Sequence, residues 1–169
     1  MANMIPISTV TVGSTSVAAI SFTGIPQIYT DLLVKISGRS AGGGSPQVRM
    51  TINGSGASIY SYNNLYGDGS GRAASTESSI TDIFIGLADG TAHTSNTFTN
   101  QEIYIPNYTS SNNKSISSDS VMENNATLSY QNLVAGLFAS TSPISSLSFT
   151  MGNNFTQYST ATLYGIRKY

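Results

Sequence analysis

The sequence contains no cysteine and no tryptophan among its 169 residues, and it has a single histidine. The absence of cysteine excludes a disulfide framework, a thiolate zinc site and a cysteine nucleophile. The absence of tryptophan disfavours a lectin, because tryptophan offers the largest ring for stacking on a sugar. No apolar run approaches the roughly 20 residues of a membrane-spanning helix, and the N-terminus does not resemble a signal peptide. We therefore expect no membrane partner.

Charged side chains are also scarce. They make up 9% of the residues, and the formal net charge is −1, whereas about a quarter of the residues are charged in an ordinary globular domain. A basic surface that would bind a nucleic-acid backbone is not expected. The eight acidic residues are scattered, and no neighbouring pair suggests general acid and base roles. The surface must consist mostly of Ser, Thr, Asn, Gly and Gln.

Short stretches rich in Val, Ile, Thr, Tyr and Phe recur between clusters of Gly, Asn and Ser, and helical spacing is hard to find. This pattern is typical of a β-sandwich or barrel. We predict one all-β domain over residues 1–169, a two-sheet antiparallel β-sandwich that is jelly-roll-like, with about ten strands and essentially no helix. The expected strands cover residues 7–12, 17–23, 30–37, 47–54, 58–66, 80–87, 97–108, 114–123, 126–138, 144–152 and 160–169.

Three further predictions concern how two of these strands pair, the segment that follows them and the N-terminus. Residues 47–54 end in an Asn-Gly turn, so we expect them to form a hairpin with residues 58–66. Residues 67–79 are rich in turn-forming residues and are expected to form a loop. Residues 1–7 form either a short N-terminal arm that reaches a neighbour or the frayed start of the first strand.

The pentapeptide GRSAG matches the G-x-S-x-G pattern of a nucleophile elbow, with Ser40 as the nucleophile. His93 would be the base, and Asp82 or Asp89 would orient it. An elbow must turn from a strand into a helix, but the AGGGSP segment that follows leads into another strand. We therefore expect a glycine-rich turn, an exposed His93 in a loop, and no enzymatic activity.

A second glycine-rich segment is GDGSGR, residues 67–72. It lacks the Gly-Lys-Ser/Thr ending of a phosphate-binding loop and the alternating acidic ligands of a calcium loop. A tight surface turn accounts for the glycines. We expect neither a cofactor nor a metal.

Tyrosine is the most informative residue type. Tyr60, Tyr62 and Tyr66 fall on one face of a predicted strand, where they form either the core face, which is the more common case, or an interface for a protein or a sugar. In the last strand, TATLYGIRKY, we expect Tyr164 and Ile166 on the face opposite the core, covered by another strand, a loop or a subunit. These five residues are the candidate interface residues.

The core face of that last strand should carry Ala161 and Leu163, with Gly165 allowing the close approach of a neighbouring element. Apolar groups near its end occur on both faces. We therefore predict that the strand is an interior member of its sheet, paired on both sides.

Four stretches together resemble small virion structural proteins of tailed bacteriophages. The resemblance lies in an F-x-x-I-P-x-x-Y-T-D-L segment, an Asn-Gly turn with a Tyr-Ser step, an Ile-Pro-Asn-Tyr strand end with a Lys after it, and a closing strand ATLYGI. In this sequence the stretches are SFTGIPQIYTDLLVKISGRS (21–40), TINGSGASIYSYNNLYGDG (51–69), IYIPNYTSSNNKSI (103–116) and ISSLSFTMGNNFTQYSTATLYGI (144–166).

The resemblance implies a jelly-roll-like module of tail fibres, neck appendages and capsid decoration proteins, without catalytic residues. Because the resemblance begins at Ser21, we expect no fibrous shaft before it and therefore a capsid decoration (cement) protein. Such a protein would be a homotrimer on the outer capsid surface of the virion, bound to the major capsid protein and stabilising the lattice by mass action. The alternative is a tail or neck fibre module that recognises host-surface polysaccharide with its end loops and with Tyr66.

Overall fold

The computed structural model describes residues 3–167, which form twelve β-strands and no helix. None of these residues therefore lies in an apolar helix that could cross a membrane. The predicted all-β class is confirmed. The strands are β1 (Asn3–Thr11), β2 (Val17–Phe22), β3 (Asp31–Gly38), β4 (Gln47–Ile52), β5 (Tyr60–Gly67), β6 (Arg72–Ile80), β7 (Ile83–Leu87), β8 (Thr99–Ile105), β9 (Lys114–Glu123), β10 (Ser129–Phe138), β11 (Leu147–Phe155) and β12 (Thr160–Arg167).

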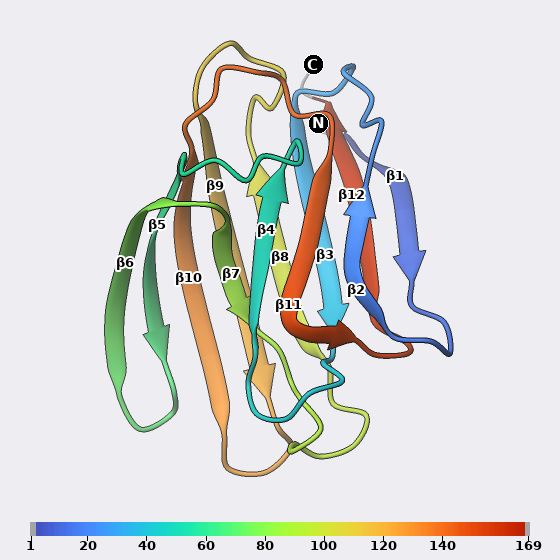
Figure 1. Cartoon of the computed structure of the whole chain (residues 1–169), viewed down its shortest axis with the longest axis vertical. Coiled ribbons are helices and arrows are strands. Elements are labelled where there is room, and N and C mark those ends of the chain that lie inside the picture. The colour runs from blue at the N-terminus through green and yellow to red at the C-terminus, as the bar shows by residue number, and fades with distance from the viewer. Residues whose placement is uncertain (1–2, 168–169) are drawn as a thin grey trace.

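The strands form a sandwich of two antiparallel sheets (Figure 1). The large sheet has the order β1-β12-β3-β8-β9-β10-β5-β6, and the small sheet has the order β2-β11-β4-β7. Without β5, β6, β9 and β10, the large sheet reduces to β1-β12-β3-β8, which faces β2-β11-β4-β7. This is the strand order of a jelly roll. The predicted jelly-roll architecture is therefore correct, and the remaining four strands are two hairpins inserted into it.

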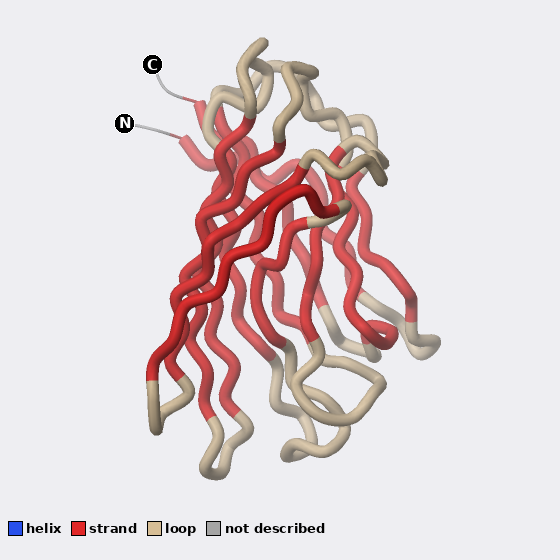
Figure 2. Tube along the Cα trace, turned by 60° about the vertical axis from the view of Figure 1, so that its left-hand side comes forward, coloured by secondary structure: helices blue, strands red, loops and turns tan. Residues whose placement is uncertain are grey.

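Both inserted hairpins extend the same side of the large sheet, beyond β8. The small sheet has no matching extension, and its edge strand β7 packs over β9 and β10. Consequently β5 and β6 project past β7, as the left side of Figure 1 shows. Seen from the side, the strands run along the long axis, and the loops gather at its two ends (Figure 2). The inner face of the projecting strands is thus left partly uncovered.

The core lies between the two sheets. Alternation places its side chains, as in β9, where every second residue from Lys114 to Met122 is buried and those between are exposed. Polar residues also point inward: the Ser118 hydroxyl donates to the Ile85 carbonyl, and the Gln101 amide donates to the Leu87 carbonyl. These bonds join the large sheet to the backbone of β7 and so fix the edge of the small sheet.

The predicted hairpin of residues 47–54 with 58–66 is wrong. The turn itself forms, with φ of 55° at Asn53 and 65° at Gly54, but β4 belongs to the small sheet and β5 to the large one. The chain crosses between sheets because both strands carry an apolar face that needs the same core. The Tyr60 hydroxyl marks the crossing, since it donates to the Ile52 carbonyl and accepts from the Ile52 amide.

The expected loop over residues 67–79 contains the strand β6, so this expectation is also wrong. β6 is an edge strand that is exposed over almost its whole length. It lacks the apolar alternation that identifies a half-buried strand, and β5 is the one strand with which it pairs. The tight turn before it is confirmed, because the Asp68 carboxylate accepts hydrogen bonds from the Ser70 and Gly71 amides, which lower its pKa.

The first and last strands pair with each other at one edge of the large sheet. Residues 3–7 lie in β1 and pair with β12, so the described part of the N-terminal segment is a strand. β12 lies between β1 and β3, which confirms that it is an interior strand. Ala161 and Leu163 face the core, and the Tyr29 ring lies directly against Gly165, so the expected close approach at this glycine is also confirmed.

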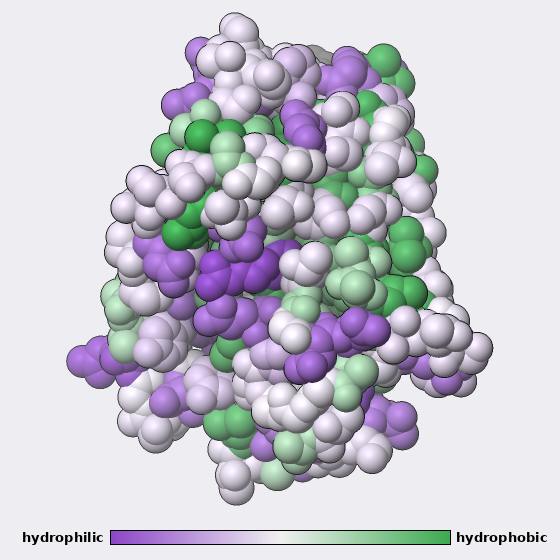
Figure 3. Space-filling model, viewed as in Figure 1, coloured by the Kyte–Doolittle hydropathy of each residue, from purple (hydrophilic) through white to green (hydrophobic). Residues whose placement is uncertain are grey.

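The face formed by the small sheet is mostly weakly polar (Figure 3). The strongest hydrophilic colour gathers over β4 and β7, where Arg49 bonds to Asp82 at 2.9 Å and to Gln47. The Arg49 guanidinium also lies 6.0 Å from the centroid of the Phe84 ring. Arg49, Asp82 and Glu77 thus form one ionic cluster on this face.

Candidate functional site

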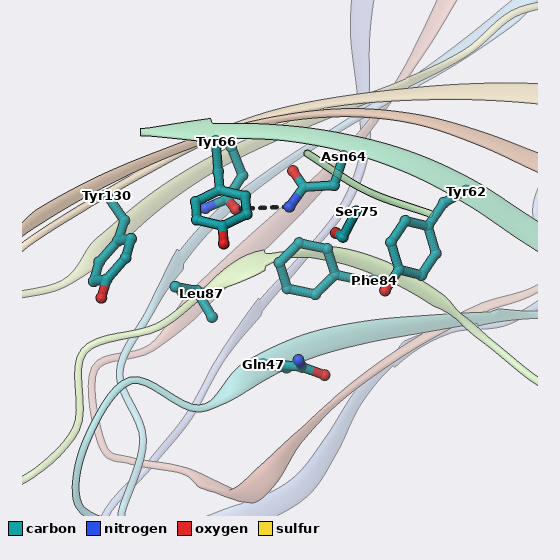
Figure 4. A pocket seen from close by; sticks show the side chains of 9 residues that line it. Gln47, Tyr62, Asn64, Tyr66, Ser75, Phe84, Leu87 and Tyr130 are labelled. Atoms are coloured by element: carbon teal, nitrogen blue, oxygen red, sulfur yellow. Dashed lines mark hydrogen bonds between the residues drawn. The ribbon is translucent and has the colours of Figure 1, made fainter. Parts of the chain in front are cut away.

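A cleft opens where the projecting strands of the large sheet pass the edge of the small sheet. We call it the lateral cleft; its volume is about 230 Å³ (Figure 4). The large sheet supplies β5, β6 and β10, and the small sheet supplies β4 and β7. Its lining residues are Gln47, Tyr62, Asn64, Tyr66, Ser75, Phe84, Leu87, Tyr130 and Asn132.

Strand alternation places the side chains on the large-sheet side of the cleft. Tyr62, Asn64 and Tyr66 are at alternate positions of β5 and point to its inner face. Asn64 is in register with Ser75 of β6, and Tyr66 is in register with Asn132 of β10. Three neighbouring strands thus direct these side chains to one spot.

Aromatic rings line the cleft from both sheets. The Tyr62 and Phe84 rings lie 5.7 Å apart between centroids. The Tyr62 hydroxyl donates to the Glu77 carboxylate at 2.8 Å. Burial, followed by this hydrogen bond, raises the pKa of Tyr62 to about 12. Tyr62 is therefore fixed and protonated at neutral pH, whereas Tyr66 and Tyr130 are only half-buried.

Two buried amides in the cleft are incompletely hydrogen-bonded. Asn64 and Asn132 are 4% and 2% exposed, and the Asn64 Nδ2 group donates to Asn132 Oδ1 at 3.3 Å (Figure 4). Asn64 Oδ1 and Asn132 Nδ2 have no partner within the described chain. Exchanging the oxygen and nitrogen of both amides again leaves one acceptor and one donor unpaired. Because buried polar groups are normally satisfied, this pair is prepared for a further polar group.

The lateral cleft is electrically neutral. None of its lining side chains carries a charge at neutral pH. The nearest ionic group is the cluster beside it, in which Arg49 lies 2.9 Å from Asp82 and 3.9 Å from Glu77. The site therefore offers rings and amide groups but no countercharge for an ionic ligand.

A second distinctive surface is the outer face of the large sheet, opposite the core. Four large apolar side chains on β5, β9 and β10 point outward, and we call them the outer patch: Leu65 (61% exposed), Val121 (44%), Leu133 (48%) and Leu137 (38%). Leu133 is in register with Leu65. Two shallow hollows of about 420 and 370 Å³ flank this pair.

The outer patch borders a charged row of the same sheet face. Lys35 pairs with Glu102 at 3.0 Å, and register places Glu102 beside Asp119 and Asp119 beside Leu133. Two like charges on adjacent strands are unfavourable. The row therefore favours a partner that brings a cation next to an apolar surface.

The five candidate interface residues lie in different places. Tyr60 and Tyr62 are buried in the core at 1% and 4% exposure, so they are corrected from interface to core residues. The reason is that β5 packs its inner face on the small sheet, where Tyr60 also lies 5.0 Å from the Phe138 ring. Tyr66, farther along the same face, reaches the lateral cleft. Tyr164 and Ile166 are half-buried on the outer face of the large sheet, and their contact with a subunit stays a prediction.

The serine and histidine of the elbow hypothesis are not brought together. Ser40 is fully buried, and its hydroxyl accepts a hydrogen bond from the Gly42 amide. His93 is not exposed as expected: its side chain is 7% exposed because Asp89 holds it, with Nδ1 at 2.8 Å from Oδ1. Its other ring nitrogen lies 3.4 Å from the Ser45 hydroxyl. Burial raises the pKa of the Asp89 carboxyl, and the His93 hydrogen bond opposes this.

We expect no ester turnover by this protein. The Ser45–His93 distance exceeds the roughly 2.6–3.2 Å of a nucleophile and its base, and Ser45 stands between Gly44 and Pro46 in a loop between two strands. Hydrolysis of p-nitrophenyl acetate and labelling by a fluorophosphonate probe measure this. Labelling that is lost in Ser45→Ala and His93→Gln but kept in Ser40→Ala would contradict the expectation.

Two residues of the lateral cleft, Tyr62 and Tyr66, were among the candidates from the sequence, but the two amides and the rings of Phe84 and Tyr130 were missed. The available signal was the pair Asn63-Asn64 inside a strand of alternating tyrosines, since it places a polar residue at an inward position. Phe84 and Tyr130 had no such signal, because they come from other strands. No group of three or more side chains able to hold a metal ion occurs within residues 3–167.

A comparison with protein-family models found no match to this chain, and a comparison with curated proteins found none either. The functional proposals therefore rest on the two surfaces described above and on the resemblance in the sequence.

Proposed function

We propose that this protein is a non-enzymatic virion structural protein of a tailed bacteriophage. Its role is that of a capsid decoration protein, which binds the major capsid protein on the outer surface of the particle as a homotrimer. The observation that carries the proposal is the outer patch. Single exposed apolar residues are common on soluble proteins, but Leu65 and Leu133 are direct cross-strand neighbours, and adjoining exposed apolar groups mark interaction surfaces.

The position of the outer patch fits attachment to a broad lattice. The patch lies on the inserted strands β9, β10 and β5 of one eight-stranded sheet, so several neighbouring strands can contact the capsid shell together. The adjacent charged row, in which Glu102 lies beside Asp119, favours a basic capsid surface. Binding that occurs only on the assembled lattice stabilises that lattice by the binding free energy at every site.

Tyr164 and Ile166 are the proposed contacts between copies of the chain. They lie on the outer face near the edge strand β1, where Ile166 is in register with the half-exposed Met4. Aromatic and aliphatic side chains of this kind commonly anchor protein interfaces. Mass photometry of the purified protein tests the homotrimer directly.

Loss of the outer patch is expected to weaken capsid binding about 100-fold. The double variant Leu65→Gln, Leu133→Gln removes two side chains whose burial contributes about 1.5–3 kcal/mol each, and 1.4 kcal/mol corresponds to a factor of ten. Binding of purified protein to capsids that lack it, followed by sedimentation, measures the effect. The control is Ile28→Gln, which removes an exposed apolar side chain outside the patch; equal binding by the double variant and this control would contradict the proposal.

A second candidate function is a tail or neck module that recognises host-surface polysaccharide, and the lateral cleft favours it. The copy number in purified virions separates the two functions. A decoration protein is present in numbers comparable with the major capsid subunits, whereas a tail or neck component is limited to the few copies that one vertex accommodates.

A further inference from the structure

We infer that the lateral cleft binds an uncharged saccharide, with one sugar ring between the aromatic side chains and sugar hydroxyls on the Asn64–Asn132 pair. This inference goes beyond attachment to a capsid. It holds whether the protein lies on the capsid or on the tail, because the residues of the cleft are separate from the outer patch.

The amide pair selects a hydroxyl group. Asn64 Oδ1 is an unpaired acceptor and Asn132 Nδ2 is an unpaired donor, and both atoms are buried in the side chains that line the cleft. A hydroxyl group both donates and accepts, so sugar hydroxyls can pair with the acceptor as well as with the donor. A purely apolar ligand would leave them unsatisfied, which costs free energy.

The aromatic side chains supply the second half of saccharide recognition. Tyr66 and Tyr130 are half-buried, with their rings turned toward the same space as Phe84 (Figure 4). Such rings offer apolar faces to the C–H groups of a sugar and a polar hydroxyl at the edge. They take the place of the tryptophan that the sequence lacks.

Charge and size narrow the class of ligand. Because no lining residue is charged, the cleft provides no cationic partner for the carboxylate of a uronic or sialic acid, and a desolvated charge without a countercharge is unfavourable. The volume of about 230 Å³ is below the roughly 300–1,000 Å³ of pockets for drug-sized ligands. The cleft therefore holds one sugar unit, with the rest of the chain running out through its open side.

Most residues that line the cleft lie outside the eight strands of the jelly roll. Six of its lining residues come from the two inserted hairpins, as the strand bounds show: Tyr62, Asn64, Tyr66, Ser75, Tyr130 and Asn132. The eight jelly-roll strands do not need two buried, half-satisfied amides. A ligand explains why they stand at inward positions, where apolar residues would pack without an unpaired group.

The test is binding of purified protein to immobilised dextran, mannan and galactan, with polygalacturonate as the charged comparison. We expect binding to at least one neutral polymer and at least tenfold weaker binding to polygalacturonate. The double variant Asn64→Leu, Asn132→Leu should lose at least tenfold in binding while its melting temperature stays equal or rises. Tyr66→Ala should also lose binding, and Tyr66→Phe should keep most of it.

Tyr158→Asn is the control, because it removes a tyrosine that is 66% exposed and lies outside the lateral cleft, and asparagine tolerates the positive φ at this position; it should bind as the unaltered protein does. Absence of binding to every neutral polymer, or equal binding by the double amide variant, would overturn the inference and leave water as the partner of the amides. Capsid binding by the same variants distinguishes this result from failure of the proposed function. The cleft variants should still bind capsids, and the Leu65→Gln, Leu133→Gln variant should still bind the saccharide.

Discussion

Arg39→Met is expected to lower the free energy of unfolding by about 3–5 kcal/mol, because several buried acceptors lose a charged hydrogen-bond donor at once. Arg39 is only 8% exposed, and its guanidinium holds the loop of residues 88–98. It donates to the carbonyls of Gly90, Thr94, Thr97 and His93 and to the Thr97 hydroxyl, at 2.8–3.2 Å.

The expected loss is large because a methionine satisfies none of these acceptors. The four carbonyls belong to a loop without strand pairing along most of its length, so the guanidinium substitutes for a backbone ladder. Buried acceptors that lose a charged donor cost more than a neutral hydrogen bond contributes. Lysine cannot replace arginine here, because its single ammonium group cannot reach acceptors arranged around a planar fork.

Urea denaturation and thermal melting followed by circular dichroism measure the loss of stability. For a chain of this size the change corresponds to a fall in melting temperature of roughly 6–20 °C. The control is Arg72→Met at an exposed position of β6, with an expected change within about 0.5 kcal/mol. A similar stability for both variants would show that the loop is held by other contacts.

Gly165→Ala is expected to destabilise the protein by about 2–3 kcal/mol, near the upper end of the cost of overpacking a core. A β-carbon at this position would lie 2.3–2.6 Å from three atoms of the Tyr29 ring. Those atoms include Cγ, so rotation of the ring about χ2 cannot relieve the clash. Tyr29 must change its χ1 rotamer or move with its backbone, and the Arg167 guanidinium, 5.7 Å from the ring centroid, would lose its contact.

Gly13→Ala provides the control, since a β-carbon there meets no atom within 4 Å. Its effect on stability should be neutral or slightly favourable, because alanine restricts the unfolded chain more than glycine does. Guanidinium denaturation of both variants gives the comparison. If Gly165→Ala and Gly13→Ala unfold at the same denaturant concentration, the close packing of Tyr29 on β12 does not contribute to stability.

The sequence pattern marked one of these two positions, Gly165, and did not mark the other, Arg39. Arg39 follows a strand in the glycine-rich stretch GRSAG. In that stretch the sequence pattern pointed to the neighbouring Ser40, as a possible nucleophile. Its acceptors are more than 50 residues away along the chain. Gly165 was recognised as a place of close approach, but the approaching residue, Tyr29, could not be identified because it belongs to a loop without periodicity.

In the candidate site, too, the sequence predicted some features, and only the tertiary structure decided the others. Alternation correctly placed Tyr60, Tyr62 and Tyr66 on one face of a strand, but it could not show that the first two are covered and the third is not. That difference arises because β7 ends the small sheet above β9 and β10. The position of a sheet edge depends on how many strands each sheet recruits, and this is a property of the whole fold.

By itself, the sequence determined the class of the fold and the places of eleven strands, because apolar alternation and turn residues act within a few neighbouring residues. It also determined a surface that is neutral and polar. Only the tertiary structure decided which sheet each strand joins, that β6 is a strand, and that the two inserted hairpins leave the lateral cleft and the outer patch. These features depend on contacts between residues far apart in the chain, where burial of a shared core outweighs the local preference for a hairpin.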